Sequence, residues 1–150
     1  MMIGELLVKK GLITQEQLDM ALEEQKIISD FLGAILIRKN FIKESDLLGA
    51  LSTQYNIPHV ELRLDAIDWN AAMRFNLDLV VEHSCLPIRE DDNMLWIAIT
   101  NPLDAHAISE SERLARPKGV HLVLISSKEM EKALQIYKEK MAYRLKKSLE

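Results

Sequence analysis

Residues 4–13 read GELLVKKGLI, and residues 33–42 read GAILIRKNFI, so the same pattern returns 29 positions later. The correspondence continues along the chain, because Leu18 matches Leu47 and Gln25 matches Gln54. A repeat this short cannot bury its own apolar face, so we expect the two copies to pack on each other. Two related surfaces side by side can also form a two-sided pocket, which makes the repeat the first place to look for function.

Each copy has the pattern of a helical hairpin. Clustered apolar residues predict a short helix over residues 3–10, and Gly11 stands where a left-handed helix cap is needed. Asn40 takes that place in the second copy, and asparagine is the next best residue for a positive φ angle. Thr14 and Gln17 have capping-box spacing and predict the start of a second helix. Asp30 or Ser29 is expected to cap the third helix, and a fourth is expected around residues 46–54.

The character of the chain changes at Pro58, which cannot continue a helix. Residues 59–62, 85–89 and 94–99 read as strands, and the acidic stretch between the last two predicts a hairpin turn. Pro87 should place its strand at a sheet edge or bulge. Helical stretches are expected from Asp68 and over residues 77–82.

A strand–helix–strand pattern over residues 94–125 predicts a parallel, right-handed crossover, with its helix at 103–115 and its second strand at 120–125. Ser126 and Glu129 have capping-box spacing and begin a last helix that runs toward Ala142. The predicted fold is therefore α+β. Residues 1–55 form a helical subdomain with motif copies at 2–25 and 31–54, residues 56–142 form a small α/β subdomain with a mixed sheet, and residues 143–150 form a charged tail or linker.

Composition limits the function classes. The chain has 150 residues and a formal net charge of −4, whereas general nucleic-acid binding usually leaves a basic excess. Cys85 is the only cysteine, so no internal disulfide can form and a reducing, cytoplasmic setting is expected. No apolar run approaches the ~18 residues that a membrane span requires, so any link to a membrane is expected to pass through a partner.

No catalytic or metal-binding pattern stands out. None of the five glycines opens a phosphate-binding loop, so the chain is not expected to be an enzyme. His83 and Cys85 lie two residues apart, but one cysteine does not make a zinc pattern, and a packed, inert thiol is expected at Cys85. The basic last helix suits either anionic lipid or a solvated face, and its acidic residues favour the solvated face.

Gly4 and Gly33 leave two interpretations open, because glycine near a helix start costs up to ~1 kcal/mol relative to alanine. Each glycine permits close approach either of the other hairpin or of a ligand, and close helix packing is the more common case. The free N–H groups at a helix start also suit a phosphate. Gln25 and Gln54 add matched amides that can donate and accept hydrogen bonds.

The doubled pattern resembles the MshEN domain, found at the N-terminus of type II secretion and type IV pilus assembly ATPases of the GspE/PilB class. It runs from Ile3-Gly4 through Leu7 and Gly11 to Leu18, Ala21, Leu22 and Gln25, and repeats after a short spacer. The segments Tyr55-x-Ile57-Pro58, Leu86-Pro87-Ile88 and Leu95 through Asp104 resemble the α/β portion of the same family.

The resemblance implies a non-catalytic docking or regulatory domain of an oligomeric ATPase. It implies a cytoplasmic location at the inner membrane, through the cytoplasmic domain of a GspL- or PilM-like platform protein. Some members bind cyclic di-GMP through the two motifs, which gives the alternative function of a sensor. The binding pattern opens with arginine, but this chain has Met2 and, in the second copy, Phe31. Loss of a charge-assisted hydrogen bond should weaken binding by about 1.5–3 kcal/mol.

The predicted contacts for that ligand or partner lie within the two motifs, and no metal or other cofactor is expected in this chain. These candidate residues are Ile3, Gly4, Leu7, Gly11, Leu12, Leu18, Leu22, Gln25, Phe31, Leu32, Gly33, Leu36, Asn40, Phe41, Leu47, Leu51 and Gln54.

Overall fold

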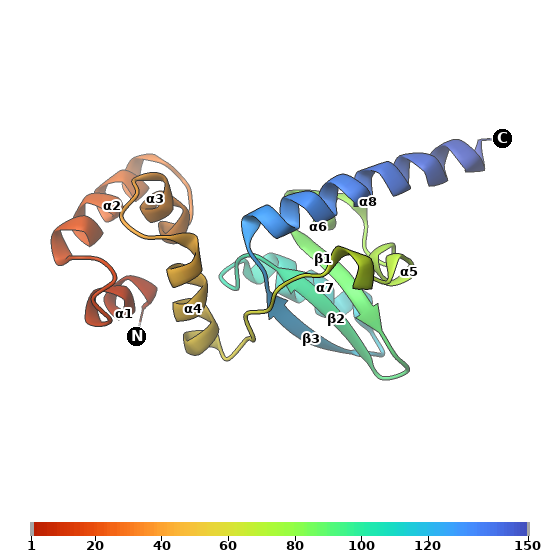
Figure 1. Ribbon diagram of the computed structural model, residues 1–150, viewed down its shortest axis with the longest axis horizontal. Coiled ribbons are helices and arrows are strands. Elements are labelled where there is room, and N and C mark those ends of the chain that lie inside the picture. The colour runs from red at the N-terminus through yellow and green to blue at the C-terminus, as the bar shows by residue number, and fades with distance from the viewer. Residues whose placement is uncertain (1, 150) are drawn as a thin grey trace. The chain divides into compact units, whose positions relative to one another are not determined.

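The computed structural model describes residues 2–149 and divides the chain into two compact units, residues 1–56 and residues 57–150 (Figure 1). We call them the N-terminal unit and the C-terminal unit. The predicted division between residues 55 and 56 lies one residue before the observed one. The N-terminal unit consists of α1 (Ile3–Lys9), α2 (Gln15–Ile27), α3 (Leu32–Arg38) and α4 (Glu44–Tyr55). The two helical hairpins are therefore present as the repeat predicts.

Local capping explains where these helices begin and end. The Thr14 hydroxyl accepts from the Gln17 amide at 3.1 Å, and the Gln17 side chain accepts from the Thr14 amide at 2.9 Å, which completes the predicted capping box. Gly11 and Asn40 have φ angles of 74° and 61°, so both copies turn through the left-handed region as expected.

The predicted cap of α3 was wrong. Phe31, not Asp30 or Ser29, occupies the N-cap position, and its side chain makes no capping hydrogen bond. The Asp30 carboxylate is used elsewhere, because it accepts from the Phe31 amide at 2.8 Å and pairs with Arg38. The Asp30 carbonyl also accepts from the Gln25 side chain at 3.0 Å. These bonds hold the segment between the two hairpins in place.

The C-terminal unit is built around a three-stranded sheet of order β1-β2-β3. β1 runs antiparallel to β2, and β3 runs parallel to it, so the sheet is mixed and the predicted hairpin and parallel crossover are confirmed. A register shift between Pro87 and Arg89 places a bulge in the edge strand β1, as proline there predicts. The elements are η1 (Leu64–Ala66), α5 (Trp69–Ala72), α6 (Leu77–Glu82), β1 (Cys85–Glu90), β2 (Met94–Ile99), α7 (Ala105–Ala115), β3 (Gly119–Leu124) and α8 (Ser127–Ser148).

The strand predicted over residues 59–62 was wrong, because only one isolated bridge joins His59 to Leu124. Leu124 donates to the Pro58 carbonyl at 2.8 Å, and its own carbonyl accepts from Val60 at 2.9 Å. The Leu62 amide does not continue this pairing with β3 and donates instead to the Glu129 carboxylate at 2.6 Å. The chain therefore leaves the sheet edge for the start of α8 after a single bridge.

Helix α8 begins at the predicted capping box, in which Ser126 and Glu129 satisfy each other's amides. Met130, Ala133 and Tyr137 are buried along its first half. The helix continues to Ser148, so residues 143–148, expected as a tail or linker, are helical. The side chains of residues 142–149 are all exposed, and residue 150 lies outside the described residues. Figure 1 shows the last turns of α8 extending past the sheet.

Candidate functional site

The two copies of the repeat make equivalent internal contacts. A Cβ atom on Gly4 would lie 2.7 Å from Leu18 Cδ1, and one on Gly33 would lie 2.7 Å from Leu47 Cδ2. Leu18 and Leu47 are themselves equivalent positions. Each glycine therefore lets the first helix of its hairpin approach a leucine of the second helix, which is the close-packing interpretation of the two glycines.

Gly4 also lies against a residue of the second hairpin. A Cβ on Gly4 would lie 3.2 Å from Leu32 Cδ2, so the first turn of α1 packs beside the first turn of α3. Met2 and Phe31 are the N-cap residues of these two helices, and neither makes a side-chain capping bond. Their side chains are 75% and 43% exposed. Two matched apolar side chains thus stand at adjacent helix starts, whereas the binding pattern of the family it resembles opens with arginine.

The candidate residues fall into three groups by exposure. Eight are buried in the core of the N-terminal unit, namely Ile3, Gly4, Leu7, Leu18, Leu32, Leu36, Leu47 and Leu51. Leu12, Gln25, Gly33, Phe41 and Gln54 are half-buried, and Gly11, Leu22, Phe31 and Asn40 are exposed. Most of the repeat's apolar pattern is therefore core packing, and the accessible part of the set is small.

A shallow depression of about 470 Å³ lies along α2, and two candidate residues, Leu22 and Gln25, contribute to its lining. The rest of the lining is charged: Asp19, Glu23 and Lys26. The carboxylates of Asp19 and Glu23 would repel a dianionic ligand in this depression. The exposed Leu22 side chain still offers an apolar contact there.

Two of the three basic residues of the second copy, Arg38 and Lys39, are already engaged. Arg38 lies 3.4 Å from Asp30 and 3.7 Å from Glu24, and Lys39 lies 3.8 Å from Glu24. These pairs connect α3 to α2 and to the inter-hairpin segment. Sequence reasoning missed this network, because Glu24 has no recognisable partner at a fixed spacing.

In the C-terminal unit, His83 donates from Nδ1 to the Asp104 carboxylate at 2.7 Å, and its ring centroid lies 5.1 Å from that of His106. Asp104 also caps α7 by accepting from the Ala107 amide at 3.1 Å. Among residues 2–149, no three His, Cys, Asp or Glu side chains gather in a way that could hold a metal ion. This cluster is a helix cap with a histidine partner.

Cys85 is completely buried and lies 3.0 Å from the Ser111 hydroxyl. That hydroxyl donates to the Ala107 carbonyl at 2.6 Å, so the thiol is left as the donor to the serine oxygen. Burial raises the pKa of Cys85 to about 11. A protonated thiol without solvent access is a poor nucleophile, which agrees with the packed role expected for it.

Asp104 gives a pH-dependent contribution to stability. Burial alone raises its pKa, but hydrogen bonds from His83 and the Ala107 amide outweigh burial, and the pKa lies below the ordinary value of 3.8. A lowered pKa in the folded state means that the stabilisation is present above about pH 4 and is lost as the pH falls further. We expect Asp104→Ala to lower the free energy of unfolding by about 1 kcal/mol at pH 7, as measured by urea unfolding.

The Asp104→Ala difference from the wild type should shrink below about pH 4. Asp104→Asn is the control, because an asparagine still caps a helix but lacks the charge that faces His83. An Asp104→Ala effect that stays constant between pH 7 and pH 3 would contradict the role of the ionised carboxylate.

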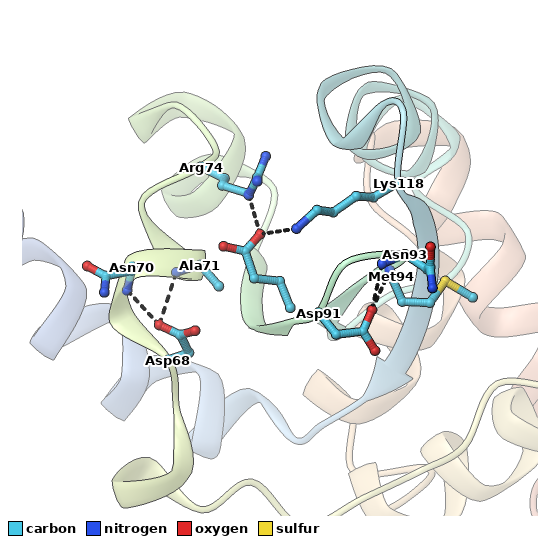
Figure 2. Close-up of polar contacts among 9 residues, drawn as sticks. Asp68, Asn70, Ala71, Arg74, Asp91, Asn93, Met94 and Lys118 are labelled. Carbon is cyan, nitrogen blue, oxygen red and sulfur yellow. Dashed lines mark hydrogen bonds and ion pairs between the residues drawn. The ribbon is translucent and has the colours of Figure 1, made fainter.

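Acidic residues at the hairpin end of the sheet also have structural partners. Figure 2 shows Asp68 accepting from the Asn70 and Ala71 amides at the start of α5, and Asp91 accepting from Asn93 and Met94 in the β1–β2 turn. Beside them, Glu90 pairs with Arg74 and with Lys118, the latter at 3.1 Å. The acidic turn predicted from sequence is therefore held by hydrogen bonds and ion pairs.

Across residues 2–149, none of the helices combines the length and apolar character that crossing a membrane requires.

Known relatives and solved structures agree on the family to which this chain is similar. The chain is 27% identical over 135 residues to the type IV pilus assembly ATPase PilB of Myxococcus xanthus, covering 90% of this chain and 24% of that protein. It is 31% identical over 123 residues to PilB of Thermus thermophilus, covering 81% and 14%. The chain thus spans about a quarter and about a seventh of these relatives.

Among solved structures, MshE with cdg superposes with a TM-score of 0.79 at 27% identity, covering 91% of this chain and 99% of that one. The N-terminal domain of XpsE superposes with a TM-score of 0.66 at 20% identity, covering 89% and 91%, which shows the fold alone. The sequence profile of the MshEN domain matches residues 55–142, the α/β part of the chain. The chain belongs to the MshEN domain family and is related to part of the type IV pilus assembly ATPases.

Proposed function

We propose that the chain is a non-catalytic docking domain of a type IV pilus or type II secretion ATPase. It binds the cytoplasmic domain of an inner-membrane platform protein of the GspL or PilM kind. The parent ATPase is oligomeric, and the domain lies in the cytoplasm at the inner membrane. The family assignment and the PilB relatives support this setting.

The observation that carries the proposal is the distribution of exposed apolar side chains. Among the described residues, six of the eleven large apolar side chains left exposed lie between residues 2 and 31. They are Met2, Met20, Leu22, Ile27, Ile28 and Phe31. Six exposed apolar side chains within the first 31 residues give this unit apolar groups that a partner protein could cover.

The direct test is isothermal titration of the chain with the cytoplasmic domain of the platform protein from the same organism. Binding supports docking, and its persistence at physiological salt is expected because the proposed contact is apolar rather than ionic. Absence of heat at both low and physiological salt would overturn the proposal.

The second candidate function is a cyclic di-GMP sensor that uses the two motifs. Two observations favour it: the superposition on the structure of MshE with cdg, and the adjacent, equivalent starts of α1 and α3. Against it stand Met2 and Phe31, which supply no positive charge for the two phosphates, and the engagement of Arg38 and Lys39 with acidic partners.

This candidate predicts a gain of function. Replacing both Met2 and Phe31 by arginine should tighten cyclic di-GMP binding by about tenfold or more, because each arginine offers charge-assisted hydrogen bonds and a stacking plane. Calorimetry with the purified chain measures it, and Met20→Arg on α2 is the matched control of equal charge. If neither the wild type nor the double variant binds at high micromolar ligand, the sensor function is wrong.

A further inference from the structure

A groove in the C-terminal unit lies between the short helix α5 and the second half of α8, and it encloses about 390 Å³. Trp69 and Asn70 of α5 line it together with Met73, the residue that follows this helix. From α8 the lining residues are Glu139, Lys140, Tyr143 and Arg144. It is open to solvent along one side, and Tyr143 is 65% exposed. Tryptophan, tyrosine and arginine are the residue types that dominate the binding energy of protein interfaces.

The charge of this groove differs from that of the whole chain. The chain has a formal net charge of −4, but residues 138–147 contain five basic residues and one acidic residue. Lys140 lies over the Trp69 ring, with its Nζ 5.5 Å from the ring centroid. Among the described residues, neither Lys140 nor Arg144 forms a salt bridge. The groove lining therefore carries two cations without an ion pair and one carboxylate, that of Glu139, so its formal charge is positive.

The shape favours a peptide over a membrane. A bilayer surface is flat on this scale and would meet the rim of a groove between two helices, while the apolar groups Trp69 and Met73 line the hollow. A side chain from an extended or helical peptide enters such a hollow, and flanking carboxylates then reach the cations at the rim.

We propose that the α5–α8 groove binds an acidic peptide segment of a partner protein, with an apolar side chain on Trp69 and Met73 and carboxylates on Lys140 and Arg144. Arginine pairs with a carboxylate through two parallel hydrogen bonds, which gives this contact direction as well as charge. The proposal concerns the C-terminal unit alone and does not depend on how the N-terminal unit docks.

The test uses the full chain and a capped Glu-Glu-Phe-Glu-Glu peptide, followed by NMR on the indole N–H of Trp69, which a Trp69→Phe variant assigns. We expect the peptide to shift this signal, and the Gln-Gln-Phe-Gln-Gln peptide to bind about tenfold more weakly or worse. Arg144→Glu should weaken binding of the acidic peptide by about tenfold or more. Lys138→Glu is the matched control, because it changes net charge equally but does not line the groove.

Three results would overturn the proposal. The first is no shift of the Trp69 signal with the acidic peptide. The second is equal weakening by Lys138→Glu and Arg144→Glu, which would mean attraction to general charge. The third is a shift caused by vesicles of equal phosphatidylglycerol and phosphatidylcholine but not by the peptide, which would make the groove a lipid contact.

Discussion

Replacing Leu36 by alanine is expected to lower the free energy of unfolding of the N-terminal unit by about 2–5 kcal/mol. Leu36 is completely buried in α3, so the change leaves a cavity that short, tightly packed helices cannot easily close. Leu7 holds the equivalent position in α1 and is also completely buried. If equivalent residues of the two hairpins pack in the same way, Leu7→Ala should lower the free energy of unfolding by a similar amount.

Amide hydrogen exchange measured in increasing urea, on peptides from residues 2–56, reports this stability separately from the C-terminal unit. Met20→Ala is the matched control, because Met20 is 54% exposed and its truncation should change stability by less than about 0.5 kcal/mol. Tolerance of alanine at Leu7 or Leu36, with an effect as small as that of the control, would contradict equivalent packing of the two copies.

Phe31→Glu is expected to weaken binding to the platform protein's cytoplasmic domain by about tenfold or more, because burying an unpaired carboxylate in an apolar contact is costly. The folded chain should tolerate this change. Phe31 is 43% exposed and makes no side-chain capping bond. An acidic residue at a helix start is also favourable for the helix dipole.

Leu145→Glu provides the control for Phe31→Glu, since Leu145 is 59% exposed and lies in α8. Calorimetric titration of both variants separates a specific contact from general repulsion by an added negative charge. Equal loss of affinity in the two variants, or none in either, would contradict an interface at the helix starts.

Local sequence signals predicted most of the fold, because the elements depend on interactions between neighbouring residues. The capping boxes at Thr14 and Ser126 and the left-handed turns at Gly11 and Asn40 are such signals. Pro87 likewise predicted that its strand lies at a sheet edge or contains a bulge, and β1 does both. These features require only the chemistry of a few consecutive side chains.

The errors came from partners outside the short spacings that capping rules describe. The Glu129 carboxylate is 67 residues from Leu62, and its bond to the Leu62 amide helps to reduce the predicted strand at 59–62 to one bridge. The Asp30 carboxylate does not cap α3, because it accepts from the Phe31 amide and pairs with Arg38. No spacing rule identifies either of these partners.

The site was harder to predict than the fold. The repeat drew attention to seventeen residues, but the structure buries eight of them, so apolar periodicity mainly marked the core. The accessible features include the N-cap side chains at Met2 and Phe31. Met2 was noted in the sequence only as a departure from a pattern. The α5–α8 groove had no signal at all, since Trp69 and Arg144 are brought together only by the fold.

Hydrogen–deuterium exchange of the chain, with and without the platform protein's cytoplasmic domain, tests the central claim most directly. The first N–H groups of α1 and α3 lack helical acceptors, so they exchange rapidly unless a partner covers them. Docking at the adjacent helix starts predicts slower exchange in residues 2–7 and 27–35 when the partner is present. A complex that forms while exchange in both segments stays unchanged would contradict this account.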